Sequence, residues 1–256
     1  MLTNAWFTEI QLSIPCIQEN LVAYSNHWAP VQLYYCVYLS TRSLFEASNQ
    51  TVQTKHSSTL KNIAHIIEKR PNLFPHPWKV LCFGDSEEKN LKYINLPSNV
   101  KISTISSLAS GEYGSFWDSF CLFLKTTRSR QIENLTKEWK KKNKRQRIPK
   151  KEKELIVRNH IPTSFLDVLY RLRVRSNYLD ADSFLVAIES TEDAKKFNAA
   201  LRRIAWYSML YFELIIARYT GKVNFEKMVN DFTGRISSGF GTKLLKHRLN
   251  NIKNAI

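Results

Sequence analysis

The chain has 256 residues and carries 38 Lys and Arg against 22 Asp and Glu, a net charge of +16. A hydrophobic content of 43% provides enough material for a packed core and excludes a wholly disordered chain. Only 7 glycines and 8 prolines occur, which favours long helices over a turn-rich β fold.

Two classes of protein are disfavoured by the cysteines and by the hydrophobic pattern. The 4 cysteines form no CxxC pair, so we expect free thiols, no metal site and no cofactor. The first residues lack a basic region that leads into an unbroken apolar run, and no apolar run is long enough to cross a bilayer. We therefore expect a soluble, cytoplasmic protein that does not bind membranes.

The first 67 residues predict three helices. Apolar residues recur at spacings of three and four from Phe7 to Trp28, and Pro15 should kink or split that helix. Pro30 suits the first turn of a second helix, whose expected buried residues are Val31, Tyr34, Tyr35, Tyr38 and Phe45. A third helix should follow Ser57 and Ser58, which can cap it.

Residues 71–114 have a different character. The prolines of "PNLFPHPW" exclude a regular helix, and "VLCFG" and "NVKISTIS" could form short strands or extended loop. We interpret this segment as an insertion.

A long basic helix is expected next. The helical period continues from Trp117 to Trp139, and Pro149 should end the helix. Residues 125–158 hold 14 Lys and Arg against 4 Asp and Glu, so we interpret them as a basic helical arm. Concentrated positive charge attracts phosphate backbones, whereas the few apolar residues argue against a membrane surface. The alternative is a solvated face that only keeps the protein in solution. The expected nucleic-acid-binding residues are Arg128, Arg130, Lys137, Lys140, Lys141, Lys142, Lys144, Arg145, Arg147 and Arg173.

The last third of the chain again predicts helices. One should start at Pro162 and Thr163, and a longer one at Thr191, with Gly221 ending it. The remaining tail predicts one or two short basic helices.

Two distant blocks resemble the HEPN superfamily of small helical bundles. One is Tyr34-Tyr35-Cys36 followed by His56-Ser57, and the other is Arg173 or Arg175 with Asn177-Tyr178, followed by "TEDA" from Thr191. The resemblance covers residues 5–67 and 160–220. It implies an all-α fold: an antiparallel helical bundle forming a single domain over residues 1–256, with 71–114 inserted.

The resemblance also implies a chemistry. Catalytic members are metal-independent ribonucleases that act as homodimers, in toxin–antitoxin or antiviral defence systems. An Arg holds the phosphate, and a His a little over one helical turn further on moves protons. Here no His follows Arg175, and Asp180 stands in that region. The candidate catalytic residues are Arg175, Asn177, Tyr178, Asp180 and His160, the last as the best remaining imidazole.

Other interpretations remain open for the same residues. Arg173 and Arg175 could instead pair with Asp167, Asp180 or Asp182, and His56 is expected to be a hydrogen-bonded core residue. Two functions follow: an RNA-cleaving effector, or a catalytically silent subunit of a larger complex that binds nucleic acid or nucleotides. The Arg-polar-Tyr cluster favours the first and the missing His favours the second. A protein-binding scaffold is a third possibility.

Overall fold

The computed structural model describes residues 1–16, 22–52, 54–85, 91–100, 116–179, 191–236 and 239–256. This part of the chain is mainly helical, with one small antiparallel hairpin, as expected for the fold class. It divides into two compact units. Unit 1 comprises Met1–Thr59 and Leu172–Ile256, and unit 2 comprises Leu60–Arg171.

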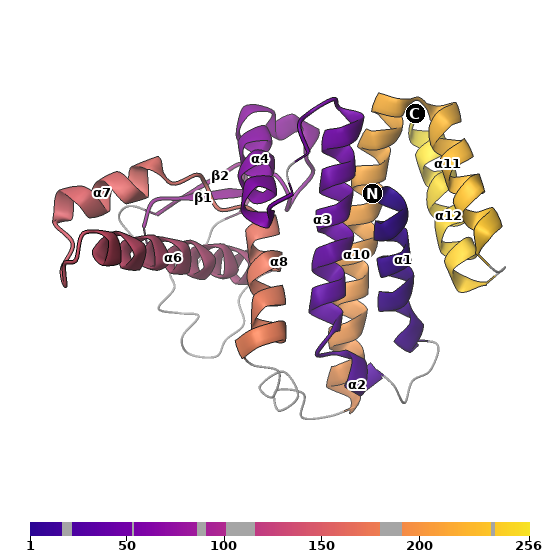
Figure 1. The fold of residues 1–256 in the computed structure, drawn as a ribbon. Coiled ribbons are helices and arrows are strands. Elements are labelled where there is room, and N and C mark those ends of the chain that lie inside the picture. Colours follow the sequence, from indigo (N-terminus) through magenta and orange to yellow (C-terminus); the bar gives the residue numbers. More distant parts are fainter. Residues whose placement is uncertain (17–21, 53, 86–90, 101–115, 180–190, 237–238) are drawn as a thin grey trace. The chain divides into compact units, whose positions relative to one another are not determined.

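Unit 1 is built from both ends of the chain. Its helices are α1 (Leu2–Ser13), η1 (Ile14–Cys16), α2 (Val22–Ser25), α3 (Ala29–Ala47), η4 (Arg175–Leu179, a π-helical turn), α10 (Thr191–Thr220), α11 (Lys222–Arg235) and α12 (Phe240–Ala255). Within unit 1, α1, α3 and α10 pack along one another, and α11 and α12 lie on one side of them (Figure 1). The first turn of α4 (His56–Lys69) and the last turn of α8 (Phe165–Val174) also belong to this unit.

The helix ends of unit 1 follow local chemistry. Pro15 lies in η1 and separates α1 from α2, and Pro30 occupies the first turn of α3, as predicted. Beyond α3, Asn49 adopts φ 55°, and Gln50 N–H donates to the Phe45 carbonyl at 2.8 Å. This left-handed ending satisfies the last carbonyls of the helix. The helix expected after Ser57 and Ser58 already begins at His56, so both serines lie inside its first turn rather than before it.

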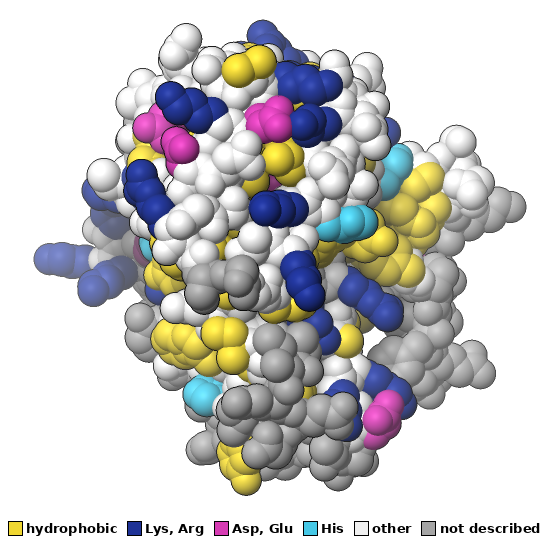
Figure 2. All heavy atoms as spheres, turned by 90° about the vertical axis from the view of Figure 1, so that its right-hand side faces the viewer, with side chains coloured by type: hydrophobic (Ala, Val, Ile, Leu, Met, Phe, Trp, Pro, Cys, Tyr) yellow, Lys and Arg dark blue, Asp and Glu magenta, His cyan; other side chains and the backbone are white. Residues whose placement is uncertain are grey.

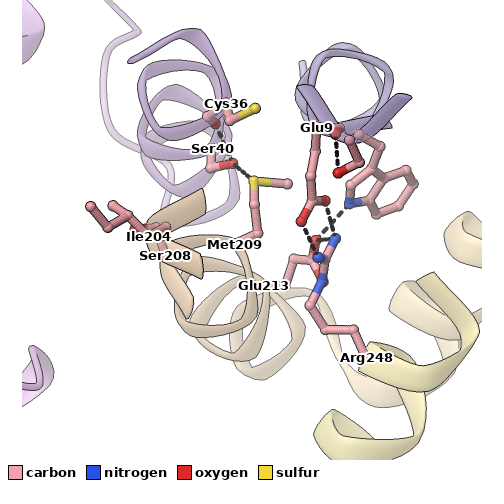
Figure 3. A network of polar contacts seen from close by, with 10 residues as sticks. Glu9, Cys36, Ser40, Ile204, Ser208, Met209, Glu213 and Arg248 are labelled. Atoms are coloured by element: carbon pink, nitrogen blue, oxygen red, sulfur yellow. Dashed lines mark hydrogen bonds and ion pairs between the residues drawn. The ribbon is translucent and has the colours of Figure 1, made fainter. Parts of the chain in front are cut away.

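The core of unit 1 contains a buried charge cluster (Figure 3). Arg248 of α12 donates to both carboxylate oxygens of Glu9, at 2.6 and 2.8 Å, and to both oxygens of Glu213, at 2.7 Å each. Trp6 Nε1–H donates to Glu213 at 2.6 Å. Burial raises the pKa of the Glu213 carboxyl, although Arg248 opposes this shift. These contacts connect α1, α10 and α12.

Unit 2 contains the remaining elements. They are most of α4 and α8, η3 (Pro71–Leu73), β1 (Leu81–Phe83), β2 (Lys92–Ile94), α6 (Phe116–Lys142) and α7 (Lys150–Asn159). The strands pair antiparallel with Leu81 opposite Ile94, and Cys82 forms a further bridge to Thr163 just before α8. Of the two possibilities left open for "VLCFG", short strand or extended loop, the structure shows a strand, and β2 lies outside both segments considered. Most of "NVKISTIS" lies outside the described residues. Both the expected insertion, 71–114, and the expected arm, 125–158, fall in this unit.

The expected basic helix is two helices rather than one. The sequence predicted a helix as far as Pro149, but α6 ends at Lys142 and Pro149 immediately precedes α7. Lys144 takes φ 50°, Arg145 N–H donates to the Lys140 carbonyl at 3.0 Å, and Lys144 N–H donates to that of Lys141 at 3.3 Å. This pair of bonds is the Schellman ending of a helix. The sequence does not indicate this ending, because no glycine stands at the position.

Candidate functional site

Three tyrosines and a histidine form an aromatic cluster in unit 1. Tyr34, Tyr35 and Tyr38 come from α3, and His56 opens α4. The Tyr34 hydroxyl and His56 Nδ1 share a hydrogen bond of 2.7 Å, and the ring centroids of Tyr38 and His56 lie 4.4 Å apart. Tyr34 and Tyr38 are buried, while Tyr35 and His56 are half-buried. The expected hydrogen-bonded role of His56 is therefore confirmed.

Two arginines lie against this cluster. Arg173, from the end of α8, places its guanidinium carbon 5.4 Å from the centre of the Tyr35 ring and 5.8 Å from that of Tyr34. Its Nη2 donates to the Tyr35 hydroxyl at 3.3 Å. Arg42 lies 5.6 Å from the centre of the Tyr38 ring, and its buried Nε has no hydrogen-bond partner among the described residues. Cation–π contacts of this kind hold the two guanidiniums beside the imidazole.

Burial and the two arginines set the charge of the imidazole. Burial lowers the pKa of His56 below its ordinary value of 6.5, and the positive charges of Arg173 and Arg42 lower it further. His56 is therefore mainly neutral at pH 7. In the tautomer that donates Nδ1–H to the Tyr34 oxygen, Nε2 carries the lone pair and can accept a proton. A neutral imidazole beside two guanidiniums can bind a phosphate and remove a proton from a neighbouring hydroxyl.

The predicted catalytic residues near Arg175 are only partly described. Arg175 and Asn177 both lie in the π-helical turn η4, where Arg175 is exposed and Asn177 is half-buried. Tyr178 also lies in this turn, but its side chain is outside the described part, as is the whole of Asp180. Asp167, considered as an arginine partner, accepts hydrogen bonds from Ser164 and Gln131.

His160 and Arg128 both lie in unit 2, where the Arg128 guanidinium donates to the His160 carbonyl. Arg128 is 1% exposed, and its guanidinium donates to the carbonyls of Gly84, Val157, His160 and Ile161. These bonds use most of the guanidinium N–H groups, and the side chain is buried, so the geometry argues against the predicted role of Arg128 in nucleic-acid binding. Burial, followed by the charges of Arg128 and Lys61, lowers the pKa of His160 to about 4.

The other predicted nucleic-acid-binding residues of unit 2 reach solvent. Most are exposed, and Lys140 is half-buried. Lys137 pairs with Glu133 at 2.5 Å on the surface of α6. Those after Lys137 come from the end of α6 and the turn before α7: Lys140, Lys141, Lys142, Lys144, Arg145 and Arg147. By contrast, the face of the molecule over α11 and α12 spreads its Lys and Arg side chains among neutral ones (Figure 2).

Sequence reasoning missed the gathering of His56, Arg42 and Arg173. The signal available was the order of the Tyr-Tyr block and His56, but nothing local placed Arg173 beside them, because 138 positions separate it from Tyr35. Arg42 follows Tyr38 by four residues on the same helix. Side chains at this spacing lie on one face, so the contact between them could have been predicted from the sequence.

Comparison of this chain with family models, with curated proteins and with solved structures finds no match. No helix among the described residues is both long and apolar enough to cross a membrane. Within the same part of the chain, no three side chains of His, Cys, Asp or Glu come together as a metal site would require.

Proposed function

We propose that this protein binds RNA and cleaves it without a metal ion, as a HEPN-like effector of a toxin or phage-defence system. The observation that carries the proposal is the arrangement in unit 1 of a neutral His56 imidazole beside the Arg173 and Arg42 guanidiniums. His56 replaces the His that the sequence lacks after Arg175. The exposed cations at the end of α6 supply the general attraction for a phosphate backbone.

The proposed reaction uses groups of the chain and of the RNA. His56 Nε2 accepts the proton of a ribose 2′-hydroxyl, and the 2′-oxygen attacks the adjacent phosphorus. The bond from phosphorus to the 5′-oxygen breaks, the 5′-oxygen takes a proton from water, and a 2′,3′-cyclic phosphate remains. Arg173 and Arg42 offset the charge that builds up on the phosphate oxygens. Tyr34 is a positioning residue, because its hydrogen bond to Nδ1 orients the imidazole; the reaction uses the tautomer in which Nδ1–H donates to the Tyr34 oxygen.

The experiment compares His56→Gln with His65→Gln on mixed tRNA in EDTA. His65 lies on the same helix but is exposed, so its variant controls for the loss of an imidazole from α4. We expect cleavage to fall about 100-fold or more in His56→Gln and to be unchanged in His65→Gln. Tyr34→Phe should lower the rate less and alter its pH dependence.

The pH profile gives a second readout. Because the neutral imidazole is the active form and its pKa is lowered, the midpoint of the acid limb of the pH profile of cleavage should lie below pH 6.5. Removing the cation in Arg173→Gln should raise the pKa of His56 and move the acid limb of the profile to higher pH. Cleavage that survives His56→Gln would contradict the catalytic assignment.

A second candidate is a catalytically silent subunit that binds nucleic acid within a larger complex. One observation favours this candidate: His56 is hydrogen-bonded through Nδ1 to the fully buried Tyr34, as a residue with a structural role would be. Salt-sensitive binding of RNA by the wild type, with no cleavage in any buffer, would support this candidate over the ribonuclease. The assembly of two copies, which the effector hypothesis includes, is tested by sedimentation of the same sample.

A further inference from the structure

The exposed face of α6 carries two phenylalanines, Phe116 and Phe123, and then a row of cations. Phe123, Arg130 and Lys137 are spaced seven residues apart, and all are exposed. At 3.6 residues per turn, a step of seven returns to within about 20° of the same direction, so the three side chains form a row along the helix. Lys141 extends this row by one turn, and the α6 row from Phe123 to Lys141 spans roughly 27 Å.

The residues of α6 that pack into the core lie outside this row. Phe120, Cys121, Leu124, Arg128 and Ile132 are buried, whereas Phe123 is 58% exposed. After Ile132 no residue of α6 is buried, and α7 has no buried residue at all. Packing within unit 2 therefore does not account for the exposed phenylalanine at the start of the row.

Carboxylates are sparse where the row ends. Glu133 and Glu138 lie beside it, and Glu133 pairs with Lys137 at 2.5 Å, but an exposed pair of this kind costs little to open. From Lys140 to Lys151 the chain has 8 Lys and Arg and no Asp or Glu. Within the described ranges, none of these 8 cations makes an ion pair.

The base of the row is held firmly. The buried Arg128 guanidinium binds carbonyls at the end of α7 and just beyond it, at Val157, His160 and Ile161, as well as that of Gly84 in unit 2. The Schellman ending at Lys144 fixes the turn between α6 and α7. A pre-organised row loses little conformational entropy when it binds a ligand.

We propose that the α6 row binds single-stranded RNA, with a base stacked on Phe123 and phosphates held by Arg130, Lys137 and Lys141. Unpaired bases offer a π face to an aromatic ring, whereas the bases of a duplex are already stacked on one another. A membrane would require a broad apolar face, but cations follow Phe123 along the row. This inference rests on the proposed function of RNA binding and names unpaired strands as its substrate class.

The test measures binding by fluorescence anisotropy with the full-length protein. The probes are a labelled RNA of about 12 nucleotides without self-complementarity, the DNA of the same sequence, and the corresponding RNA duplex. Vesicles containing phosphatidylserine form a fourth arm. Phe123→Ala should weaken binding of the single-stranded RNA by about 5- to 100-fold and leave duplex binding within about twofold. Tyr207→Ala, which removes an exposed aromatic side chain from α10, is the matched control and should change neither.

The cations are tested separately through salt dependence. The triple variant Arg130→Gln, Lys137→Gln, Lys141→Gln should reduce the slope of log affinity against log salt by about two, since each phosphate contact contributes about 0.7 for a single strand. The control is a second triple variant that removes the same charge from α11 and α12: Lys227→Gln, Lys243→Gln, Lys246→Gln. These three lysines are exposed, and their replacement should leave the slope nearly unchanged.

Several results would overturn the inference. These are equal loss of duplex and single-strand binding in Phe123→Ala, equal slopes for the two triple variants, and vesicle binding that exceeds RNA binding. Preference of the row for the DNA strand over the RNA strand would also overturn it. A failure of the cleavage proposal would appear as cleavage that survives in His56→Gln, or as no cleavage by the wild type, while the single strand is still bound. Either result would leave this inference standing.

Discussion

Burial controls the protonation of both histidines that matter here. His160 has a buried Nε2 without a hydrogen-bond partner among the described residues, and its pKa is lowered to about 4. His56 is shifted in the same direction by burial and by two arginines, but it retains a hydrogen bond to Tyr34. The first is a half-buried imidazole in a structural environment, and the second is an imidazole at a cationic site.

We predict that His160 destabilises the protein in acid. Its pKa in the folded protein is below the value near 6.5 expected after unfolding, so the unfolded chain binds more protons between pH 6.5 and about 4. The stability contributed by neutral His160 is therefore complete above pH 6.5 and is lost as the pH falls towards 4. We expect the free energy of unfolding of the wild type to fall by about 1–2 kcal/mol relative to His160→Gln over this range, since partial exposure screens the effect.

Urea titrations of both proteins at several pH values measure this difference. His65→Gln, which removes an exposed imidazole, serves as the control and should follow the wild type. A constant difference between the wild type and His160→Gln from pH 7 to pH 4 would show that His160 titrates normally.

At the scale of elements, helix ends were set by residues that favour particular backbone angles. Prolines begin or divide helices at Pro15 and Pro30, and Gly221, with φ 85°, separates α10 from α11 as predicted. The end of α6 differs, because Lys144 occupies a left-handed position that usually holds glycine. The chain therefore carries some backbone strain at the turn between its two basic helices.

Replacing Lys144 should separate backbone strain from charge. Lys144→Gly and Lys144→Ala remove the same charge, but only glycine adopts φ 50° without steric cost. We expect Lys144→Gly to be more stable than Lys144→Ala by about 1 kcal/mol, measured by amide hydrogen exchange in the last turn of α6. Equal protection in the two variants would mean that the turn relaxes to another conformation.

For the molecule as a whole, two buried arginines organise two different units. Arg248 joins α1, α10 and α12 in unit 1, and Arg128 joins α6 to the end of α7 in unit 2. Each is buried with its donors bound by oxygen atoms, so removing either leaves acceptors unpaired in the interior. The loss should be felt first in the unit that contains the arginine.

Hydrogen exchange can test this division. Arg248→Met leaves Glu9 and Glu213 buried without their cation and should cost about 3–5 kcal/mol, seen as lost protection in α1, α10 and α12. Arg128→Met should instead reduce protection mainly in α6 and α7. Lys246→Met, an exposed substitution on α12, controls for the loss of a positive charge. Uniform loss of protection across both units in each variant would show that the chain unfolds as a single cooperative unit.

The sequence by itself determined the helical class of the described chain, most helix boundaries and the position of the basic segment. These features follow from periodicity, prolines and charge, all of which act between residues close in the chain. It failed at Lys144, where a left-handed ending lacked its usual glycine, and at Arg128. The charge of Arg128 favoured solvent, although its helical position midway between Leu124 and Ile132 placed it on the apolar face of α6.

Only the tertiary structure decided which side chains meet. Arg248 binds Glu9 across 239 positions, and Arg173 reaches Tyr35 across 138. Neither helical periodicity nor composition carries information about contacts at such separations, because they depend on how the helices pack after the chain has folded back. The cationic site around His56 results from that packing. The charge of the α6 row, by contrast, can be read from the sequence, because its residues recur at helical spacing along one segment.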